Sequence, residues 1–432
     1  PRHTQLLTIP REEDIMRSKI AIAALAAAGL AVLSTACSSG NGFGSSSASG
    51  TASAAPNKSA LTLMFGSSGT AETAAVQQAA KAFTKQSGIP VQVVAASNLT
   101  QQVAQGFSGG TPPNVFYLDP LTFQNYAKDG VLDAYPSGLP NASGFASALT
   151  QAFTYKSQFT CEPKDASTLA LYVNTTDWQQ AGLGAPPANW SQLEADAKKL
   201  TTGGRAGLTI DQTHSGIDEF FYQNGGTVTN AAGTKVELDS SQNVAALTFL
   251  KGMLNQGIMK FPSQVGAGFS GQAFGENKAA MDVIGNWENG ELQSDYPNVK
   301  FKVYPLPAGP SGTHATLSFT NCWGVPKQQS NLAGAIDFVK FLTTSQQEMT
   351  FSKAFGVIPS LTTAQSQYET AYPQYATFVQ ELAYAHPDIA IAGATQALSA
   401  FDSALQQLAT GNPAAILGTA QQNLQAVINQ GA

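Results

Sequence analysis

The stretch that decides the fold is ALTLMFGSSGTAETAAVQQAAKAFTKQSGIPVQVVAAS, residues 60–97. Its first residues alternate apolar and polar side chains and stop at Gly66, which is typical of a strand with one buried face. The following segment has apolar residues on one helical face and should end near Gly88. VQVVAAS reads as a second strand. The apolar residues on the helical face are Val76, Ala79, Ala80 and Phe83.

Strands and helices continue to alternate along the chain. The apolar runs at 114–119 and 169–174 read as strands. The helix that contains WSQLEADAKKL is expected to begin with a capping box of Ser191 and Glu194. This alternation predicts an α/β fold with mostly parallel sheets. Because 432 residues exceed what one compact core usually holds, two domains are expected.

The composition limits the class of protein. Hydrophobic residues make up 43% and charged residues 12%, which is typical of a globular chain. The net charge of −6 argues against nucleic acid or an anionic membrane surface as the main partner. The four histidines are scattered without ligand spacing, so no metal site and no cofactor are expected.

The N-terminal part predicts export. MRSKIAIAALAAAGLAVLSTACSSG, residues 16–40, has a basic head and an apolar run too short to span a membrane. A cysteine directly after the small residues resembles a bacterial lipoprotein signal, which would make Cys37 the lipid-bearing residue. We therefore expect an upstream extension without fold at 1–15, a signal peptide at 16–36 and a flexible tether at 37–59.

The two other cysteines, Cys161 and Cys322, would then lie in an oxidising compartment. We expect them to form a disulfide, and the alternative is a pair of free buried thiols.

Four further segments, in this order along the chain, resemble the extracellular solute-binding proteins of bacterial ABC importers, in their sugar-binding, maltose-type branch. TPPNVFYLDPLTFQNYAKDGVLDAY contains a strand, a helix and a GVL turn, and FGENKAAMDVIGNWENGEL resembles the family's segment with Ala-Met and Gly-x-Trp. The four segments are residues 111–135, 169–201, 274–292 and 341–360.

The resemblance implies a periplasmic-binding-protein fold of two lobes joined by hinge crossings, with the ligand in the cleft between them. By analogy, the chain crosses near 172–174, 318–321 and 358–360. The implied first lobe is 60–172 with 320–359, and the second lobe is 173–319 with 360–432.

The resemblance also implies function and partners. It implies an exported, lipid-anchored and monomeric binding protein at the outer face of the cell membrane, without catalysis or a cofactor. Its partners would be a carbohydrate ligand and the permease subunits of an ABC importer, and nucleic acid is not expected.

Trp287 is the strongest candidate for ligand contact. It lies in AMDVIGNWENGEL, where a buried strand ends at Gly285 and an aromatic ring follows at the presumed edge of the cleft. Aromatic rings stack on the apolar face of a sugar, and amides and carboxylates bind its hydroxyl groups. Asn286 and Glu288 are therefore weaker companions of Trp287.

Other candidates lie at strand ends or near the crossings, and each has a structural alternative. For Ser67 and Ser68 the alternative is helix capping, and Asp119 can also cap the helix after Pro120. Lys164 and Asp165 can form a surface ion pair instead. Tyr222 and Trp323 can belong to the core.

Enzymatic functions are less well supported. GFSGG at 106–110 has the spacing of a nucleophile elbow, but a helix precedes Ser108 where a strand is required. An exported glycosidase using acids such as Asp119 and Glu288 is one alternative function. A non-carbohydrate solute is the other alternative.

Overall fold

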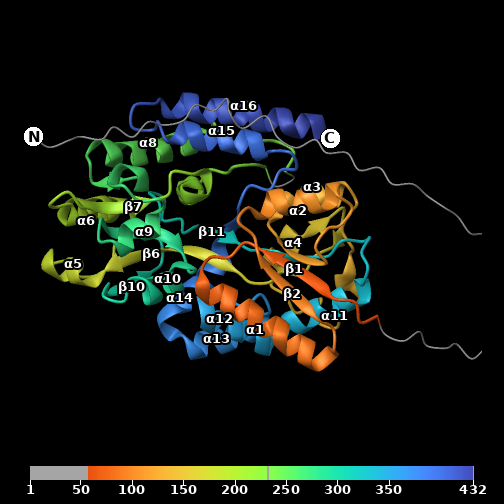
Figure 1. The fold of residues 1–432 in the computed structure, drawn as a ribbon. Coiled ribbons are helices and arrows are strands. Elements are labelled where there is room, and N and C mark those ends of the chain that lie inside the picture. Colours follow the sequence, from red (N-terminus) through yellow and green to blue (C-terminus); the bar gives the residue numbers. More distant parts are fainter. Residues whose placement is uncertain (1–56, 231–232, 432) are drawn as a thin grey trace, which may run out of the picture. The chain divides into compact units, whose positions relative to one another are not determined.

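The computed structural model describes residues 57–230 and 233–431 (Figure 1). These residues contain two large sheets, and we call the smaller sheet with its helices lobe 1 and the larger one with its helices lobe 2. The expectations for the upstream extension, the signal peptide, Cys37 and most of the tether lie outside the described residues. Among the described residues, no helix combines the length and the apolar character needed to cross a bilayer.

Lobe 1 is built on a four-stranded sheet with the order β12-β3-β1-β2. The strand β1 pairs in parallel with β2 and β3, and β12 is antiparallel to β3. The strands are β1 (Leu61–Phe65), β2 (Val91–Ala95), β3 (Val115–Leu118) and β12 (Cys322–Gly324), with a small hairpin of β4 (Thr154–Tyr155) and β5 (Gln158–Phe159). The helices are α1 (Thr70–Ser87), α2 (Leu99–Ser108), α3 (Pro120–Lys128), α4 (Ser147–Ala152), α11 (Leu332–Leu342) and α12 (Ser345–Phe355).

The opening strand–helix–strand segment confirms the prediction from periodicity. The alternating residues of β1 are buried on one face, and every residue of the predicted apolar stripe of α1 is buried. Gly88 ends α1 in the left-handed conformation, at φ 72°, and its N–H donates to the Thr84 carbonyl oxygen. The pattern therefore placed both ends of this unit correctly.

Lobe 2 is built on a seven-stranded sheet with the order β13-β11-β6-β9-β7-β8, and β10 pairs with β6. The strands β7, β9, β11 and β13 run in one direction, and β6 runs against them. The strands are β6 (Ser167–Asn174), β7 (Ala206–Ile210), β8 (Met259–Lys260), β9 (Ala279–Gly285), β10 (Phe301–Tyr304), β11 (Thr316–Phe319) and β13 (Ala385–Pro387). The helices are α5 (Thr175–Gln180), α6 (Trp190–Leu200), α7 (Asp218–Gln223), α8 (Ser241–Asn255), α9 (Ser270–Gly275), α10 (Glu288–Ser294), α13 (Thr362–Ala371), α14 (Ala376–Glu381), α15 (Thr395–Leu405) and α16 (Pro413–Gly431).

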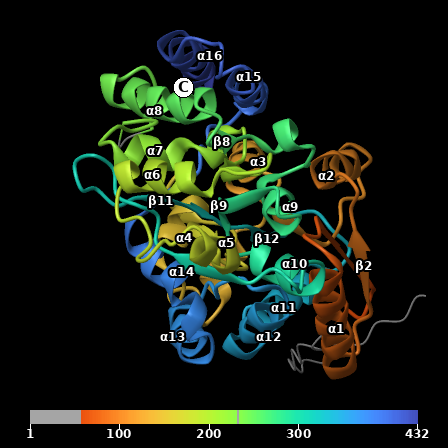
Figure 2. The same ribbon diagram turned by 90° about the vertical axis from the view of Figure 1, so that its left-hand side faces the viewer.

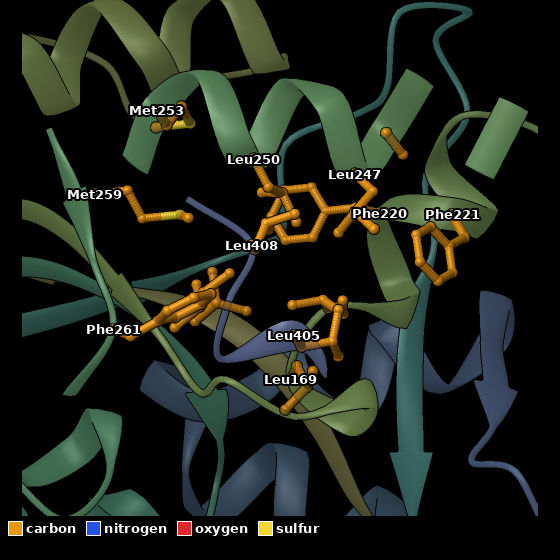
Figure 3. Close-up of a cluster of buried hydrophobic side chains, with 14 of the residues drawn as sticks. Leu169, Phe220, Phe221, Leu247, Leu250, Met253, Met259, Phe261, Leu405 and Leu408 are labelled. Atoms are coloured by element: carbon orange, nitrogen blue, oxygen red, sulfur yellow. The ribbon is translucent and has the colours of Figure 1, made fainter. Parts of the chain in front are cut away.

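The core of lobe 2 joins segments far apart in sequence. Helices α8, α15 and α16 lie together in both views (Figures 1 and 2). Figure 3 shows side chains of α7, α8 and α15 directed into one buried cluster above β6 and β8. Helices α15 and α16 therefore complete the core of a lobe that begins near residue 167. Labelled members include Phe220, Leu250, Met259 and Leu405.

The chain passes between the two sheets three times, and the segment 161–166 contacts both other crossings. The Lys164 N–H donates to the Asn321 carbonyl oxygen at 2.8 Å. The Ala166 N–H donates to the Ile358 carbonyl oxygen, also at 2.8 Å, and the Ala166 carbonyl oxygen accepts the Ile358 N–H in return. We call residues 161–166 the hinge segment.

The first crossing lies earlier than the resemblance implied. All of β6 belongs to the larger sheet, so the chain leaves lobe 1 before Ser167 and not at 172–174. The apolar run identified the strand, but a fully buried strand gives no periodic signal to show which sheet it joins.

A disulfide between Cys161 and Cys322 holds the start of the hinge segment against β12. The two residues are 161 positions apart in sequence, and their Cα atoms are 5.7 Å apart. The Trp323 N–H donates to the Glu162 carbonyl oxygen beside it. Covalent and backbone bonds therefore fix the same crossing.

Replacement of both cysteines by serine (C161S/C322S) should lower the free energy of unfolding by about 2–5 kcal/mol, because the cross-link restricts a long loop of the unfolded chain. Denaturant titration of the variant and the parent under non-reducing conditions measures the difference. The same titration with reductant should bring the parent to the variant's midpoint. Coinciding midpoints without reductant would contradict a stabilising role.

The end of the predicted tether is bound to lobe 1. Asn331 caps α11 through its Oδ1, and its Nδ2 donates to the Ser59 carbonyl oxygen at 2.8 Å. Asn57 donates to the Ser330 carbonyl oxygen. The expected flexible segment therefore does not extend to residue 59.

Candidate functional site

One edge of the lobe 2 sheet collects the carboxyl ends of four strands. Because β7, β9, β11 and β13 run in the same direction, the residues that follow them lie along the same edge. In α/β sheets this edge is the usual place for a ligand. The following residues are Asp211 after β7, Asn286 and Trp287 after β9, Thr320 after β11 and Asp388 after β13.

The smaller sheet has a corresponding edge in lobe 1. The parallel strands β1 and β3 end side by side, and they are followed by Ser67, Ser68 and Asp119. These residues are half-buried or exposed. The strand-end rule therefore identifies candidate ligand groups on both lobes.

The two lobes contact each other beside α3. Leu121 packs against the hydrophobic cluster of lobe 2. The Gly393 N–H of lobe 2 donates to Asn125 Oδ1 of lobe 1 at 2.8 Å. A cavity of about 690 Å³ lies at this junction. It is lined by α3 and residues 151–155 of lobe 1, and by Tyr222, residues 385–392 and the end of α16 in lobe 2.

Trp287 lies half-buried at the end of β9. Its ring is edge-on to Phe319, with 5.5 Å between the ring centroids. A Cβ at Gly285 would lie 2.0 Å from Trp287 Cζ3, so the glycine makes room for this ring. The Trp287 ring therefore packs between Gly285 of its own strand and Phe319 of β11. It lies outside the lining of the cavity beside α3.

Asn286 joins the crossings instead of facing the cleft. Its side chain is fully buried. Its Oδ1 accepts the Thr168 N–H at 3.1 Å, and its Nδ2 donates to the Gly356 carbonyl oxygen at 3.0 Å. Both functional groups of this amide are therefore used in positioning β6 and the end of α12.

Glu288 is also buried, beside Gly271 at the start of α9. Neither carboxyl oxygen has a hydrogen-bond partner among the described residues. Burial raises the pKa of Glu288 to about 9, and the negative charges of Glu291, Asp211 and Asp295 add to this effect. The side chain is consequently a neutral acid at pH 7, which differs from the predicted role as an exposed ligand group.

The replacement Glu288→Gln should change the pH dependence of stability. Below about pH 4.5 the side chain is protonated in both the folded and the unfolded chain. Between pH 4.5 and about 9 only the folded chain keeps the proton, so the free energy of unfolding of the parent falls as pH rises. Glutamine does not titrate, so the variant should gain several kcal/mol on the parent between these limits, up to about 6 kcal/mol.

Denaturant titrations of both proteins across this pH range measure the gain. Glu369→Gln is the control for the substitution itself, because Glu369 lies half-exposed on α13. A difference between variant and parent that does not change with pH would contradict the buried neutral acid.

Tyr222 belongs to the lining of the cavity beside α3. Its ring stacks face to face on His386, with 3.8 Å between centroids and an interplanar angle of 3°. Burial lowers the pKa of His386, so its ring is neutral at pH 7. The pair forms a flat aromatic platform at the junction of the lobes.

Ser67 and Ser68 precede α1 and are exposed. They do not cap the helix, because the N-cap residue is Gly69. The Ser68 N–H and Oγ both donate to Glu72 Oε2, at 2.7 and 2.8 Å. Glu72 therefore fixes the loop that carries both serines.

Lys164 and Asp165 are buried within the hinge segment, not on the surface of the cleft. Lys164 forms ion pairs with Asp165 and with Glu72, the latter at 3.6 Å. Its Nζ also lies 4.4 Å from the ring centroid of Tyr117 and 5.4 Å from that of Phe355. Because one ammonium group joins three elements of lobe 1 to the hinge segment, both residues have structural contacts in place of the predicted ligand contact.

Asp119 and Trp323 have different environments. Asp119 is half-buried, and its Oδ1 accepts the Thr122 N–H at the start of α3. Its Oδ2 is then the oxygen that can accept from a ligand. Trp323 is fully buried against Tyr117 and Phe351 in the lobe 1 core, so the core alternative describes its position.

Sequence reasoning missed the groups contributed by the C-terminal part of the chain. His386 lies in β13 and Asp388 directly follows it, and this strand has only three residues and gives no periodic signal. His214 bonds Asp402 through Nδ1 at 2.7 Å, and its Nε2 lies 3.6 Å from Asp388. Within residues 57–230 and 233–431, no group of three or more histidines, cysteines and acids is arranged to hold a metal ion.

Comparison with known proteins identifies related sequences. The family described as bacterial extracellular solute-binding protein matches residues 78–380, which is more than half of the chain. A putative binding protein of Brucella abortus is 25% identical over 284 residues, covering 62% of this chain and 67% of its own.

Solved structures share the fold at low sequence identity. An ABC substrate-binding protein of Listeria monocytogenes in complex with cycloalternan has a TM-score of 0.77 and 22% identity, covering 86% of this chain and 100% of its own. The maltotriose-binding protein of Thermus thermophilus has a TM-score of 0.75 and 23% identity, covering 85% of this chain and 100% of its own. A Mycobacterium tuberculosis protein in complex with glycerophosphocholine has a TM-score of 0.76 and 19% identity, covering 86% of this chain and 99% of its own.

Proposed function

The chain belongs to the bacterial extracellular solute-binding proteins, and we propose that it binds a sugar or oligosaccharide between its lobes for an ABC importer. The observation that carries this proposal is the inter-lobe cavity, whose lining includes residues at the carboxyl ends of β3 in lobe 1 and β13 in lobe 2. The cavity volume of about 690 Å³ is within the usual range of about 300–1,000 Å³ for small-molecule sites. Structural neighbours that bind cycloalternan and maltotriose support the sugar class.

Aromatic and polar groups of both lobes suit a sugar ligand. Trp287 and Tyr222 would each stack on a sugar ring, and Asp119, Ser67 and Ser68 would bind hydroxyl groups. Tyr222 stacks on His386 of β13, and the Trp287 ring lies against Phe319 at the end of the neighbouring strand β11.

Ligand binding would act by a shift of population between open and closed lobes. A ligand that contacts both edges favours the closed state by its difference in affinity for the two states. The Asn125–Gly393 hydrogen bond and the packing of Leu121 join the two lobes beside α3. The closed form would then deliver the ligand to the permease.

Attachment to the membrane is a separate proposal. The apolar segment before Cys37 supports an export signal with lipidation of that cysteine, and the chain would act as a monomer. Mass spectrometry of the N-terminal peptide from the native host tests this directly, because an unmodified Cys37 peptide would exclude the anchor.

A non-carbohydrate solute is the second candidate, and the neighbour with glycerophosphocholine favours considering it. A thermal-shift screen against mono- and oligosaccharides, polyamines, glycerophosphodiesters and peptides separates the two classes, since a ligand bound only by the folded state raises its stability. A response to saccharides alone supports the proposal. A response only to another class replaces it, and release of smaller sugars from a bound oligosaccharide would indicate a glycosidase instead.

Trp287→Ala should weaken sugar binding by about 1–3 kcal/mol, because a stacked aromatic contact is lost. Isothermal titration calorimetry with the best saccharide of the screen measures this. Trp178→Phe is the control, since Trp178 packs in α5 and donates through Nε1 to the Gly184 carbonyl oxygen. Equal affinities of parent and Trp287→Ala would remove Trp287 from the site.

A further inference from the structure

The inter-lobe cavity has an acidic end, which bears on the class of its ligand. Asp388 lines the cavity from lobe 2. Asp119 lies opposite in lobe 1, as the N-cap of α3, and the first residue of that helix, Pro120, lines the same cavity. These two carboxyl groups therefore lie on opposite lobes beside the same cavity.

The positive charge near Asp388 belongs to His214, which also interacts with Asp402. His214 Nε2 lies 3.6 Å from Asp388, while its Nδ1 bonds Asp402 at 2.7 Å. Hydrogen bonding to Asp402 and the charges of Asp388, Asp218 and Asp402 outweigh burial and raise the pKa of His214 to about 9. One protonated imidazole therefore faces more than one carboxylate.

The carboxyl groups around Asp388 exceed the cations. Burial is the main cause that raises the pKa of Asp388. The negative charges of Asp402 and Asp119 raise it further, whereas His214 and the Ile389 N–H lower it. Asp218 lies one helical turn before Tyr222 on the same face of α7. It is buried, and neither of its carboxyl oxygens has a partner among the described residues.

The remaining basic residue of the cavity lining lies at the other end of α3. Lys128 is eight residues after Pro120, which is about 12 Å along a helix axis. Its Nζ lies near Gly431, at 3.5 Å from the position a Cβ would take there. The positive charge of Lys128 therefore lies at the end of the cavity beside α16 and not at the end beside Asp388.

The aromatic platform suits a cation. The Tyr222 ring faces the cavity region and rests on a neutral His386, so no positive charge lies behind it. The face of a tyrosine ring attracts ammonium groups. Asp388 and Tyr222 thus line the cavity from lobe 2, and Asp119 adjoins its lining in lobe 1, directly before Pro120.

We propose, on the basis of the sugar-binding function above, that the ligand is a saccharide with a protonated amino group, which lies between Asp119 and Asp388 against Tyr222. A neutral sugar would donate hydroxyl hydrogens to the same carboxylates but would leave their repulsion in place. An ammonium group both donates hydrogen bonds and neutralises the pair, so it would favour closure of the lobes. Asp119 and Asp388 are accordingly the residues that determine specificity.

Matched ligands test this inference on the full chain by calorimetry at about pH 6.5, where such amino groups are protonated. One set is the chitosan disaccharide, di-N-acetylchitobiose and cellobiose, which share their linkage and differ in charge. The other set is kanamycin and its fully N-acetylated form. The amino member of at least one set should bind about tenfold tighter than its neutral partners.

The advantage of the amino ligand should shrink as NaCl rises from about 0.05 to about 0.5 M, whereas neutral ligands should respond little. Asp388→Asn and Asp119→Asn should each lower the affinity for the amino ligand more than the affinity for its neutral partners, so that most of the advantage is lost. Asp337→Asn is the control, since it removes one exposed negative charge from α11. Unfolding temperatures of the variants show that each is folded, and the salt dependence of the parent needs no variant.

The outcomes separate this inference from the proposed function. Neutral sugars that bind as tightly as their amino partners would overturn the inference and leave sugar binding intact. Binding of spermidine or other solutes without any saccharide would overturn both.

Discussion

The structure depends on the hinge segment, residues 161–166, because this segment is bonded to both other crossings. Backbone hydrogen bonds join it to Asn321 on one side and Ile358 on the other, and the disulfide fixes its start to β12. Inside it, the buried Lys164 joins Glu72 to Asp165, and Glu72 holds the Ser68 loop. The geometry of the hinge and the geometry of one edge of the cleft are therefore set by the same charged group.

Much of the fold could be predicted from the sequence where periodicity is strong. The stripe of α1 and its end at Gly88 are examples, because one buried face leaves a clear 3.6-residue pattern. Helix starts were less certain. The predicted capping box at Ser191 is wrong, since Asn189 caps α6 and accepts the Gln192 N–H. Two good capping residues within one turn cannot be ranked without the tertiary contacts that fix the helix.

The candidate site was only partly predictable, for a related reason. Trp287 and Asp119 follow strands that are recognisable as apolar runs, and both lie at the sheet edges where ligands bind in this fold class. Trp323 was also predicted as a ligand contact, from its position near a crossing. Its side chain instead packs into the lobe 1 core, because it lies within β12, which is antiparallel to β3. Asp388 and His386 depend on a three-residue strand near the C-terminus, so only the assembled sheet brings them to the junction.

The contribution of the C-terminal part has a consequence for the order of synthesis. The wall of the inter-lobe cavity in lobe 2 uses residues 385–392 and the end of α16, and the lobe 2 core includes Leu405 and Leu424. A growing chain that lacks these residues has neither a finished larger lobe nor a closed ligand site. Ligand in the surroundings therefore cannot stabilise a chain that has been synthesised only as far as residue 384.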